Sequence, residues 1–197
     1  MAEYSMVSIP KEGANPGTPR GKKNVIIVLD FDNYTMTTDE KNVKVTALTA
    51  VDDTKLPIGI FVNQNSLDCG DELEGEAYSR GLLPHVNFDH PGTSLAINEF
   101  KNNCMNANLG VIVVECDSSA TTAKLYGRPC APLVMQQAQE QDTNEAHLNH
   151  FELRAEQRGW GVAVIDKADI PVTDNATINT FLGLTAAAAG DNNGEQQ

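Results

Sequence analysis

The chain has 197 residues, with 27 acidic and 14 basic side chains and a formal net charge of −13. This length supports one sizeable core and does not require two domains. The negative charge repels phosphate backbones, which excludes tight binding of nucleic acid over most of the surface. Aromatic residues make up only 6% and Trp160 is the single tryptophan, so we expect an aliphatic core.

The four cysteines lie too far apart in the sequence to form a Cys-x-x-Cys pair. We expect Cys69, Cys104, Cys116 and Cys130 to be small buried residues that hold neither a metal nor a disulfide. The N-terminus lacks the pattern of a signal peptide, and no apolar run approaches the ~20 residues that span a bilayer. We therefore expect a protein of a reducing intracellular compartment with no membrane partner.

Residues 1–23 hold three prolines and three glycines without a hydrophobic period, which predicts an extended N-terminal arm. Its apolar residues Met6, Val7 and Ile9 are typical of a disordered tail or of a segment that docks on a neighbouring subunit. From residue 24 onward, the runs NVIIVLDF, KNVKVTALTAV and PIGIFVN predict three strands at short spacing.

Next comes an acidic stretch with five carboxylates within nine positions. Like charges at this density predict a solvated loop rather than a packed element. The five residues are Asp68, Asp71, Glu72, Glu74 and Glu76. LPHVNFDHPG then alternates as a strand does before Pro91 and Gly92 end it.

The segment at about 94–107 predicts the one helix of the fold. Ile97, Phe100 and Cys104 fall on a single face, and Thr93 or Ser94 can accept hydrogen bonds from the amides of the first turn. GVIVVEC follows at once as a strand. LYGRPCAPLVM contains two prolines, which cannot donate to a ladder, so we expect an edge strand or a crossing between sheets.

The period of AHLNHFELRAE fits a strand or a helix, and we interpret it as a strand because GWGVAVID, a clear strand, follows soon. The sequence thus predicts six to eight strands, without helices between consecutive ones. This favours a mainly β fold, an antiparallel β-sandwich or open barrel, over residues 24–173. Residues 174–197 are small and polar, and we expect a mobile C-terminal tail.

The segment around Asp30 and Asp32 resembles a catalytic motif. VIIVLDFDNYT ends a strand in Asp-x-Asp and resembles the first motif of haloacid dehalogenase-type phosphatases, which would make Asp30 the nucleophile and Asp32 the general acid and base near Mg²⁺. That family requires a threonine two positions after the second aspartate and a helix thereafter. Here Thr35 comes one position too late, and the following residues alternate as a strand does. We therefore interpret Asp30, Asp32 and Asn33 as turn formers.

Histidines offer no better site. His85 and His90 lie near Asp89, and His147 and His150 are three residues apart, but side chains three apart on a strand point to opposite faces. No phosphate-binding loop and no Gly-x-Ser-x-Gly elbow occurs. The sequence therefore predicts no enzyme, no catalytic or metal site and no cofactor.

The stretch from about His90 to Leu133 resembles virion structural proteins of long-tailed bacteriophages, most of all tail tube subunits. The likeness rests on the helix TSLAINEFKNNCMN running into GVIVVEC and on LYGRPCAPL, and it covers less than a quarter of the chain. It implies a homo-oligomer of stacked, hexameric rings whose acidic lumen lets DNA pass without binding. Other virion tail proteins would be partners, and the location would be the virion, after assembly in the host cytoplasm.

Two questions stay open at this point. The acidic residues of 68–76 would face the lumen, or would contact the basic arm residues Arg20, Lys22 and Lys23 of another ring. A capsid decoration protein or a head-to-tail connector would share this composition and strand content.

Overall fold

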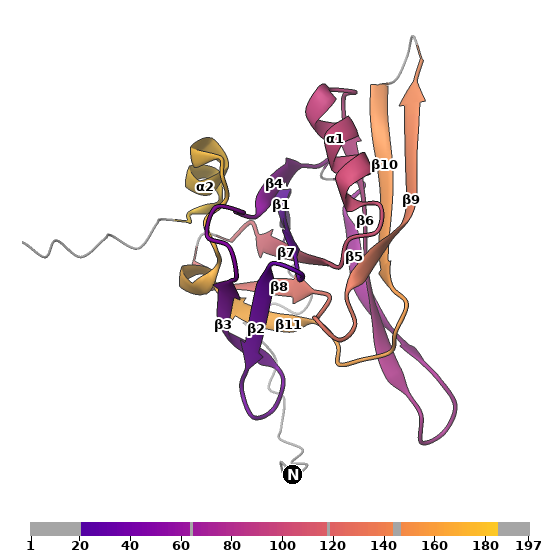
Figure 1. Ribbon diagram of the computed structural model, residues 1–197, viewed down its shortest axis with the longest axis vertical. Coiled ribbons are helices and arrows are strands. Elements are labelled where there is room, and N and C mark those ends of the chain that lie inside the picture. The colour runs from indigo at the N-terminus through magenta and orange to yellow at the C-terminus, as the bar shows by residue number, and fades with distance from the viewer. Residues whose placement is uncertain (1–20, 64, 118, 144–146, 185–197) are drawn as a thin grey trace, which may run out of the picture.

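The computed structural model describes residues 21–63, 65–117, 119–143 and 147–184, and its strands fall into two groups (Figure 1). In the first group the strands lie in the order β2-β3-β11-β8-β7-β1-β4, and every pair is antiparallel except β11 with β3. These strands are β1 (Lys22–Asp30), β2 (Tyr34–Thr38), β3 (Lys44–Ala50), β4 (Ile58–Phe61), β7 (Leu109–Glu115), β8 (Thr122–Tyr126) and β11 (Ala163–Asp166).

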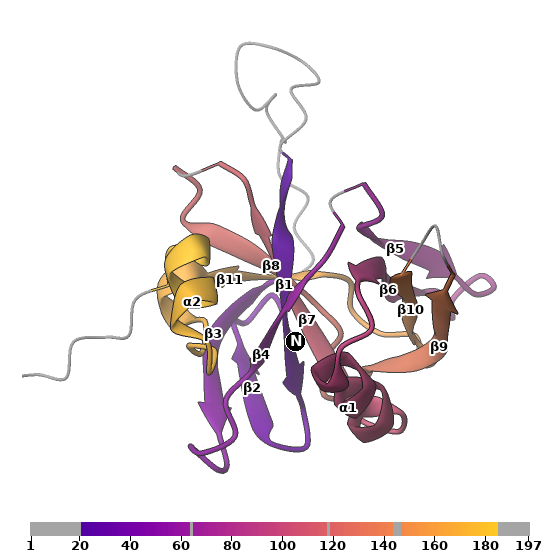
Figure 2. The ribbon, with the colours of Figure 1, turned by 90° about the horizontal axis from the view of Figure 1, so that it is seen from above.

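The second group is an antiparallel sheet in the order β9-β10-β6-β5. It contains β5 (Asp68–Glu74), β6 (Gly81–Pro91), β9 (Leu133–Asp142) and β10 (His147–Ala155). The backbone pair Leu109–Leu133 joins it to β7 of the first group. Figures 1 and 2 show these four strands side by side at one flank of the molecule.

Two hydrophobic clusters meet at β1 and β7. Alternate residues of β1 point to opposite faces, so Ile26 and Val28 belong to a cluster shared with the second group, whereas Ile27 and Leu29 belong to a cluster under β2, β3, β8 and β11. Burial on both faces explains why VIIVL and VIVV are continuous apolar runs rather than alternating ones.

Two α-helices and one short 3₁₀ helix (η1, Lys167–Asp169) complete the fold. α1 (Leu95–Cys104) buries Ile97 and Phe100 as predicted, but Ser94 at its N-cap makes no side-chain capping bond. α2 (Ala176–Leu182) is capped by Asn175, whose side chain accepts from two backbone amides, and ends at Gly183 in the left-handed conformation. Leu182 is fully buried in the second cluster. This helix lies within residues 174–197, for which the sequence predicts a mobile tail.

The predicted fold class, a mainly β sandwich or open barrel, is confirmed. The crossing between sheets is confirmed too, because β8 ends at Tyr126 in the first group and β9 begins at Leu133 in the second. Of AHLNHFELRAE, the residues His147–Ala155 form β10, as predicted. The division into arm, domain and tail stays a prediction, although β1 begins two residues before the expected domain start and residues 1–20 lie outside the described part.

Two predictions are wrong. The acidic stretch 68–76 is mostly strand β5, which tolerates the charges because side chains alternate between its two faces and most of them are exposed. The four cysteines, all of them free, are not the buried residues expected: Cys116 and Cys130 are exposed, and Cys69 and Cys104 are partly buried. Cys116 directly follows β7, and its thiol donates to the carbonyl of Lys22 at 2.9 Å.

Candidate assembly surface

The second strand group presents a polar face on the side away from the hydrophobic clusters. The side chains that the register of its four strands places on this face include twelve polar ones, and we name these twelve together the polar face. They are Asp68, Glu72 and Glu74 of β5; His85, Asn87 and Asp89 of β6; His150, Glu152 and Arg154 of β10; and Gln137, Gln139 and Gln141 of β9. Five carboxylates stand against one guanidinium, so the face is negative.

Arg154 neutralises part of that charge. Its Nη2 donates to Glu72 Oε2 at 3.0 Å and to Glu74 Oε1 at 3.1 Å. A hollow of about 340 Å³ lies beside it, lined by residues that include Asp68, His85 and Glu152. The predicted acidic set is thus divided: Asp68, Glu72 and Glu74 share the polar face, whereas the carboxylate of Asp71 lies on the other side of β5 against Gly161.

Glu76, the fifth residue of that set, lies in the hairpin between β5 and β6. The same hairpin carries Tyr78, which is fully exposed and has a φ of 70°, in the left-handed region that non-glycine residues rarely adopt. In Figure 1 this hairpin extends to one end of the long axis, and α1 lies toward the other.

His150 is the one histidine of the polar face held between two carboxylates. Its Nδ1 lies 2.6 Å from Asp89 Oδ1 and its Nε2 lies 3.3 Å from Glu152 Oε1. The hydrogen bond to Asp89 is the main cause that raises the pKa of His150, and partial burial opposes it. Because His147 lies three residues earlier on the same strand, it pairs with Asp142 instead and does not join this cluster.

Both outer edges of this sheet are open. Within the described residues β5 pairs only with β6, and β9 pairs beyond β10 only through Leu133. The remaining residues of β9, from Gln136 to Asp142, are exposed and mostly glutamine. Unpaired strand edges are templates for another strand. The polar face therefore has a free edge on either side.

Of the three predicted basic residues, Arg20 lies outside the described residues. Lys22 and Lys23 are the first residues of β1: the Lys22 Nζ donates to Cys69 Sγ of β5 at 3.0 Å, while the Lys23 Nζ donates to the carbonyl of Phe181 and lies 5.0 Å from its ring centre. Within one subunit, Lys22 thus already reaches the strand that carries the acidic set.

Asp30 and Asp32 form a turn. The Asp32 amide donates to Asp30 Oδ1 at 3.0 Å, and the Asn33 amide donates to the Asp30 carbonyl at 3.0 Å. The Asn108 side chain donates to Asp32 Oδ1 at 3.0 Å. β2 and β3, an antiparallel pair, follow where a phosphatase of the haloacid dehalogenase type requires a helix. The turn-forming interpretation is confirmed, and the phosphatase alternative is wrong.

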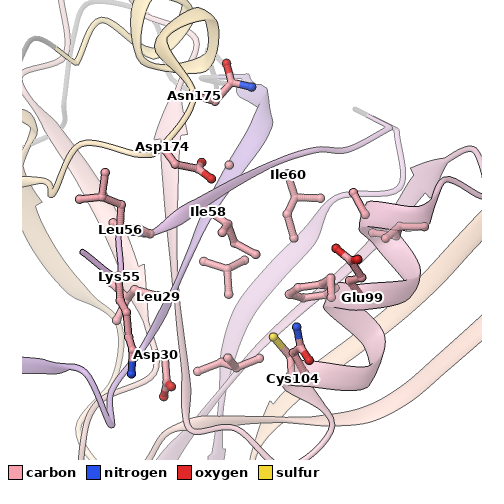
Figure 3. A pocket seen from close by; sticks show the side chains of 18 of the residues that line it. Leu29, Asp30, Lys55, Leu56, Ile58, Ile60, Glu99, Cys104, Asp174 and Asn175 are labelled. Atoms are coloured by element: carbon pink, nitrogen blue, oxygen red, sulfur yellow. The ribbon is translucent and has the colours of Figure 1, made fainter. Parts of the chain in front are cut away.

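An apolar groove that the sequence analysis did not foresee lies between β4 and α1 (Figure 3). It has a volume of about 570 Å³. Ile58 and Ile60 of β4 line one wall, and Ile97 and Phe100 of α1 line the other. Its charged lining residues are Asp30, Lys55, Asp174 and, on α1 itself, Glu99. These four charged residues come from four separate segments of the chain. No single sequence pattern therefore predicts the groove.

Among the described residues, no group of three or more histidine, cysteine, aspartate or glutamate side chains is placed to hold a metal ion. No helix within the same residues is long and apolar enough to cross a membrane.

Comparison with known proteins does not assign the chain to a family. No protein-family model matches the chain, and no curated protein matches it. A search of solved structures found a chain of the cryo-EM structure of the anti-feeding prophage baseplate, 6-fold symmetrised. That chain is 11% identical, the match covers 78% of this chain and 98% of that one, and the TM-score is 0.39. A TM-score this low does not establish a common fold.

Proposed function

We propose that this chain is a structural, non-catalytic subunit of a bacteriophage-type virion, and specifically a tail tube subunit. Subunits join into stacked, hexameric rings, and the polar face lines the lumen through which DNA passes. The observation that supports this most is that one sheet has a negative polar face and, within the described part of the chain, a free edge on either side.

The strand directions suit ring closure. Neighbours within the group are antiparallel throughout, so across four strands β9 and β5 run in opposite directions. A second subunit placed by rotation about an axis along the strands brings its β9 against β5 of the first as an antiparallel pair. Repeated pairing of this kind closes a continuous sheet and leaves no exposed edge.

The side chains of the two edges are also compatible. Gln137, Gln139 and Gln141 would stand on the same face as Asp68, Glu72 and Glu74 of the neighbour. Glutamine amides donate to carboxylates without adding like charge. The resulting lumen is lined by carboxylates, which repel the phosphates of DNA and favour passage over binding.

Cysteine cross-linking tests this pairing. In a background with Cys116→Ser and Cys130→Ser, the pair Glu72→Cys with Gln139→Cys should form intermolecular disulfides on oxidation, seen as a ladder of oligomers in denaturing gels without reductant. Negative-stain microscopy of the same sample should show rings or tubes with a central hole. The matched control pairs Glu72→Cys with Thr54→Cys, an exposed position between β3 and β4, and should give no ladder.

Gln137→Cys and Gln141→Cys, each combined with Glu72→Cys, are tested in parallel, so that neighbouring registers of the β5–β9 pair are sampled. A chain that stays monomeric at high concentration, with no ladder from any of the three pairs, would refute the proposal. Charge reversal of Lys22 and Lys23 tests the separate contact between rings: unchanged assembly and unchanged salt dependence would exclude it.

A further inference from the structure

We infer that the outer edge of β4, which pairs with no strand among the described residues, receives an extended strand from a second copy of this chain, namely residues 4–9, whose apolar side chains enter the groove beside α1. The inference rests on the proposed function, since it names a contact between subunits. The mode of recognition is strand addition, in which backbone hydrogen bonds give affinity and pockets for alternate side chains give specificity.

The first observation is the direction of the β4 backbone. The Val62 amide donates to the Asn24 carbonyl at 2.9 Å, and the antiparallel register with β1 then directs the backbone groups of Ile58 and Ile60 to β1 as well. Those of Gly59 and Phe61 point the other way. The Phe61 carbonyl is already engaged by His90 Nδ1 at 2.8 Å, which leaves the Gly59 amide and carbonyl and the Phe61 amide for an added strand.

The second observation is the position of the groove. Five consecutive residues, 57–61, line it. Side chains on both faces of the strand, and the backbone between them, therefore contribute to the groove. A groove that lies over one face of a strand would be lined by every second residue. This one therefore follows the free edge of β4, with α1 as its opposite wall (Figure 3). Leu56 and Phe61 at its ends are 45% and 46% exposed.

The third observation concerns what can occupy it. Residues 1–20 lie outside the described part of the chain, and Tyr4, Met6, Val7 and Ile9 concentrate apolar side chains near their start. Two acidic and two basic side chains balance within these twenty residues, in a chain whose net charge is −13. The segment is therefore not repelled by the groove's charged lining, in which three carboxylates face one lysine.

The fourth observation is reach, and it permits a second copy. Twelve residues separate Ile9 from β1, and a chain of twelve residues spans at most about 40 Å. Along β1, Val28 beside the groove lies about 20 Å from Lys22. The segment is therefore long enough to reach the groove of a neighbouring copy, and the rings of the proposed function supply such neighbours.

Hydrogen exchange of the full-length chain tests the inference. The backbone amides of Gly59 and Phe61 should exchange freely in dilute protein and at least about tenfold more slowly at a roughly hundredfold higher concentration. The variant Met6→Asp with Val7→Asp replaces two neighbouring residues, whose side chains would point to opposite faces of the added strand. It should abolish that protection. The matched control, Ala14→Asp with Thr18→Asp, adds the same charge within the spacer and should retain it.

Three outcomes would overturn the inference: no protection at any concentration, protection independent of concentration, which means that the segment binds its own subunit, or protection that Met6→Asp with Val7→Asp leaves intact. The test separates the two proposals. A β5–β9 cross-link ladder with freely exchanging Gly59 and Phe61 amides supports the rings and refutes strand addition. Concentration-dependent protection of these amides without a cross-link ladder supports strand addition and refutes the rings.

Discussion

At the scale of single residues, His150 gives the polar face a measurable pH dependence. Asp89 raises the pKa of His150 above its ordinary value of 6.5, so the folded state binds the proton more tightly than the unfolded state. The stability from this pair is fully present below about pH 6.5 and is lost as the pH rises through the raised pKa. Asp89→Asn should lower the pKa of His150, as followed by its ring resonances in NMR.

The same variant should lose more stability at about pH 5.5 than at about pH 8.5, measured by urea unfolding. Asp142→Asn, which removes the partner of the exposed His147, is the control and should leave the His150 titration unchanged. A greater loss at the higher pH would contradict the assignment of Asp89 as the main cause.

At the scale of elements, three aromatic rings attach α1 to the second strand group. Phe151 of β10 stacks on Phe88 with ring centres 5.0 Å apart and meets Phe100 of α1 edge to face at 5.4 Å. Phe151→Ala should lower the free energy of unfolding by about 3–5 kcal/mol, because it leaves a cavity in a fully buried site. Phe181→Ala, at a ring that is 48% exposed, should cost less than about 1 kcal/mol.

Urea unfolding monitored by circular dichroism checks both values. Equal losses for Phe151→Ala and Phe181→Ala would mean that the aromatic contacts do not hold α1 in place.

Elements differed in how far the sequence could predict them. β1 and β7 are buried on both faces, so their apolar runs carry an unambiguous signal, and α1 carries its stripe of Ile97 and Phe100. β5 is an exposed edge strand, and only Cys69 packs on the core from it, which leaves acidic residues to dominate its pattern. α2 has only seven residues, too few for a hydrophobic period, although Asn175 and Gly183 are readable as its capping residues.

The candidate surface was beyond prediction for a different reason. The polar face joins residues between Asp68 and Arg154 from four strands, and only strand order and register place Arg154 beside Glu72. The acidic stretch itself was visible in the sequence. That Asp71 lies on the opposite side of β5 from Glu72 follows once the segment is known to be a strand.

At the scale of the whole molecule, charge governs how readily copies approach one another. With a net charge of −13, subunits repel at long range, and salt shortens the Debye length from about 10 Å at 0.1 M to about 3 Å at 1 M. Assembly should therefore begin at lower protein concentration in high salt, as measured by sedimentation velocity. Asp68→Asn with Glu74→Gln should weaken this dependence. Assemblies that dissolve as salt is added would instead indicate that ion pairs hold them together.

The hairpin between β5 and β6 gives any ring of these subunits a direction. In every subunit it extends toward one end of the long axis, with Tyr78 exposed, while α1 lies toward the other (Figure 1). Subunits related by rotation about an axis along the strands would all turn their Tyr78 side chains to the same rim. A stack of such rings would have two chemically different ends, so a single capping protein that recognises Tyr78 could stop its growth at one end and leave the other free to elongate.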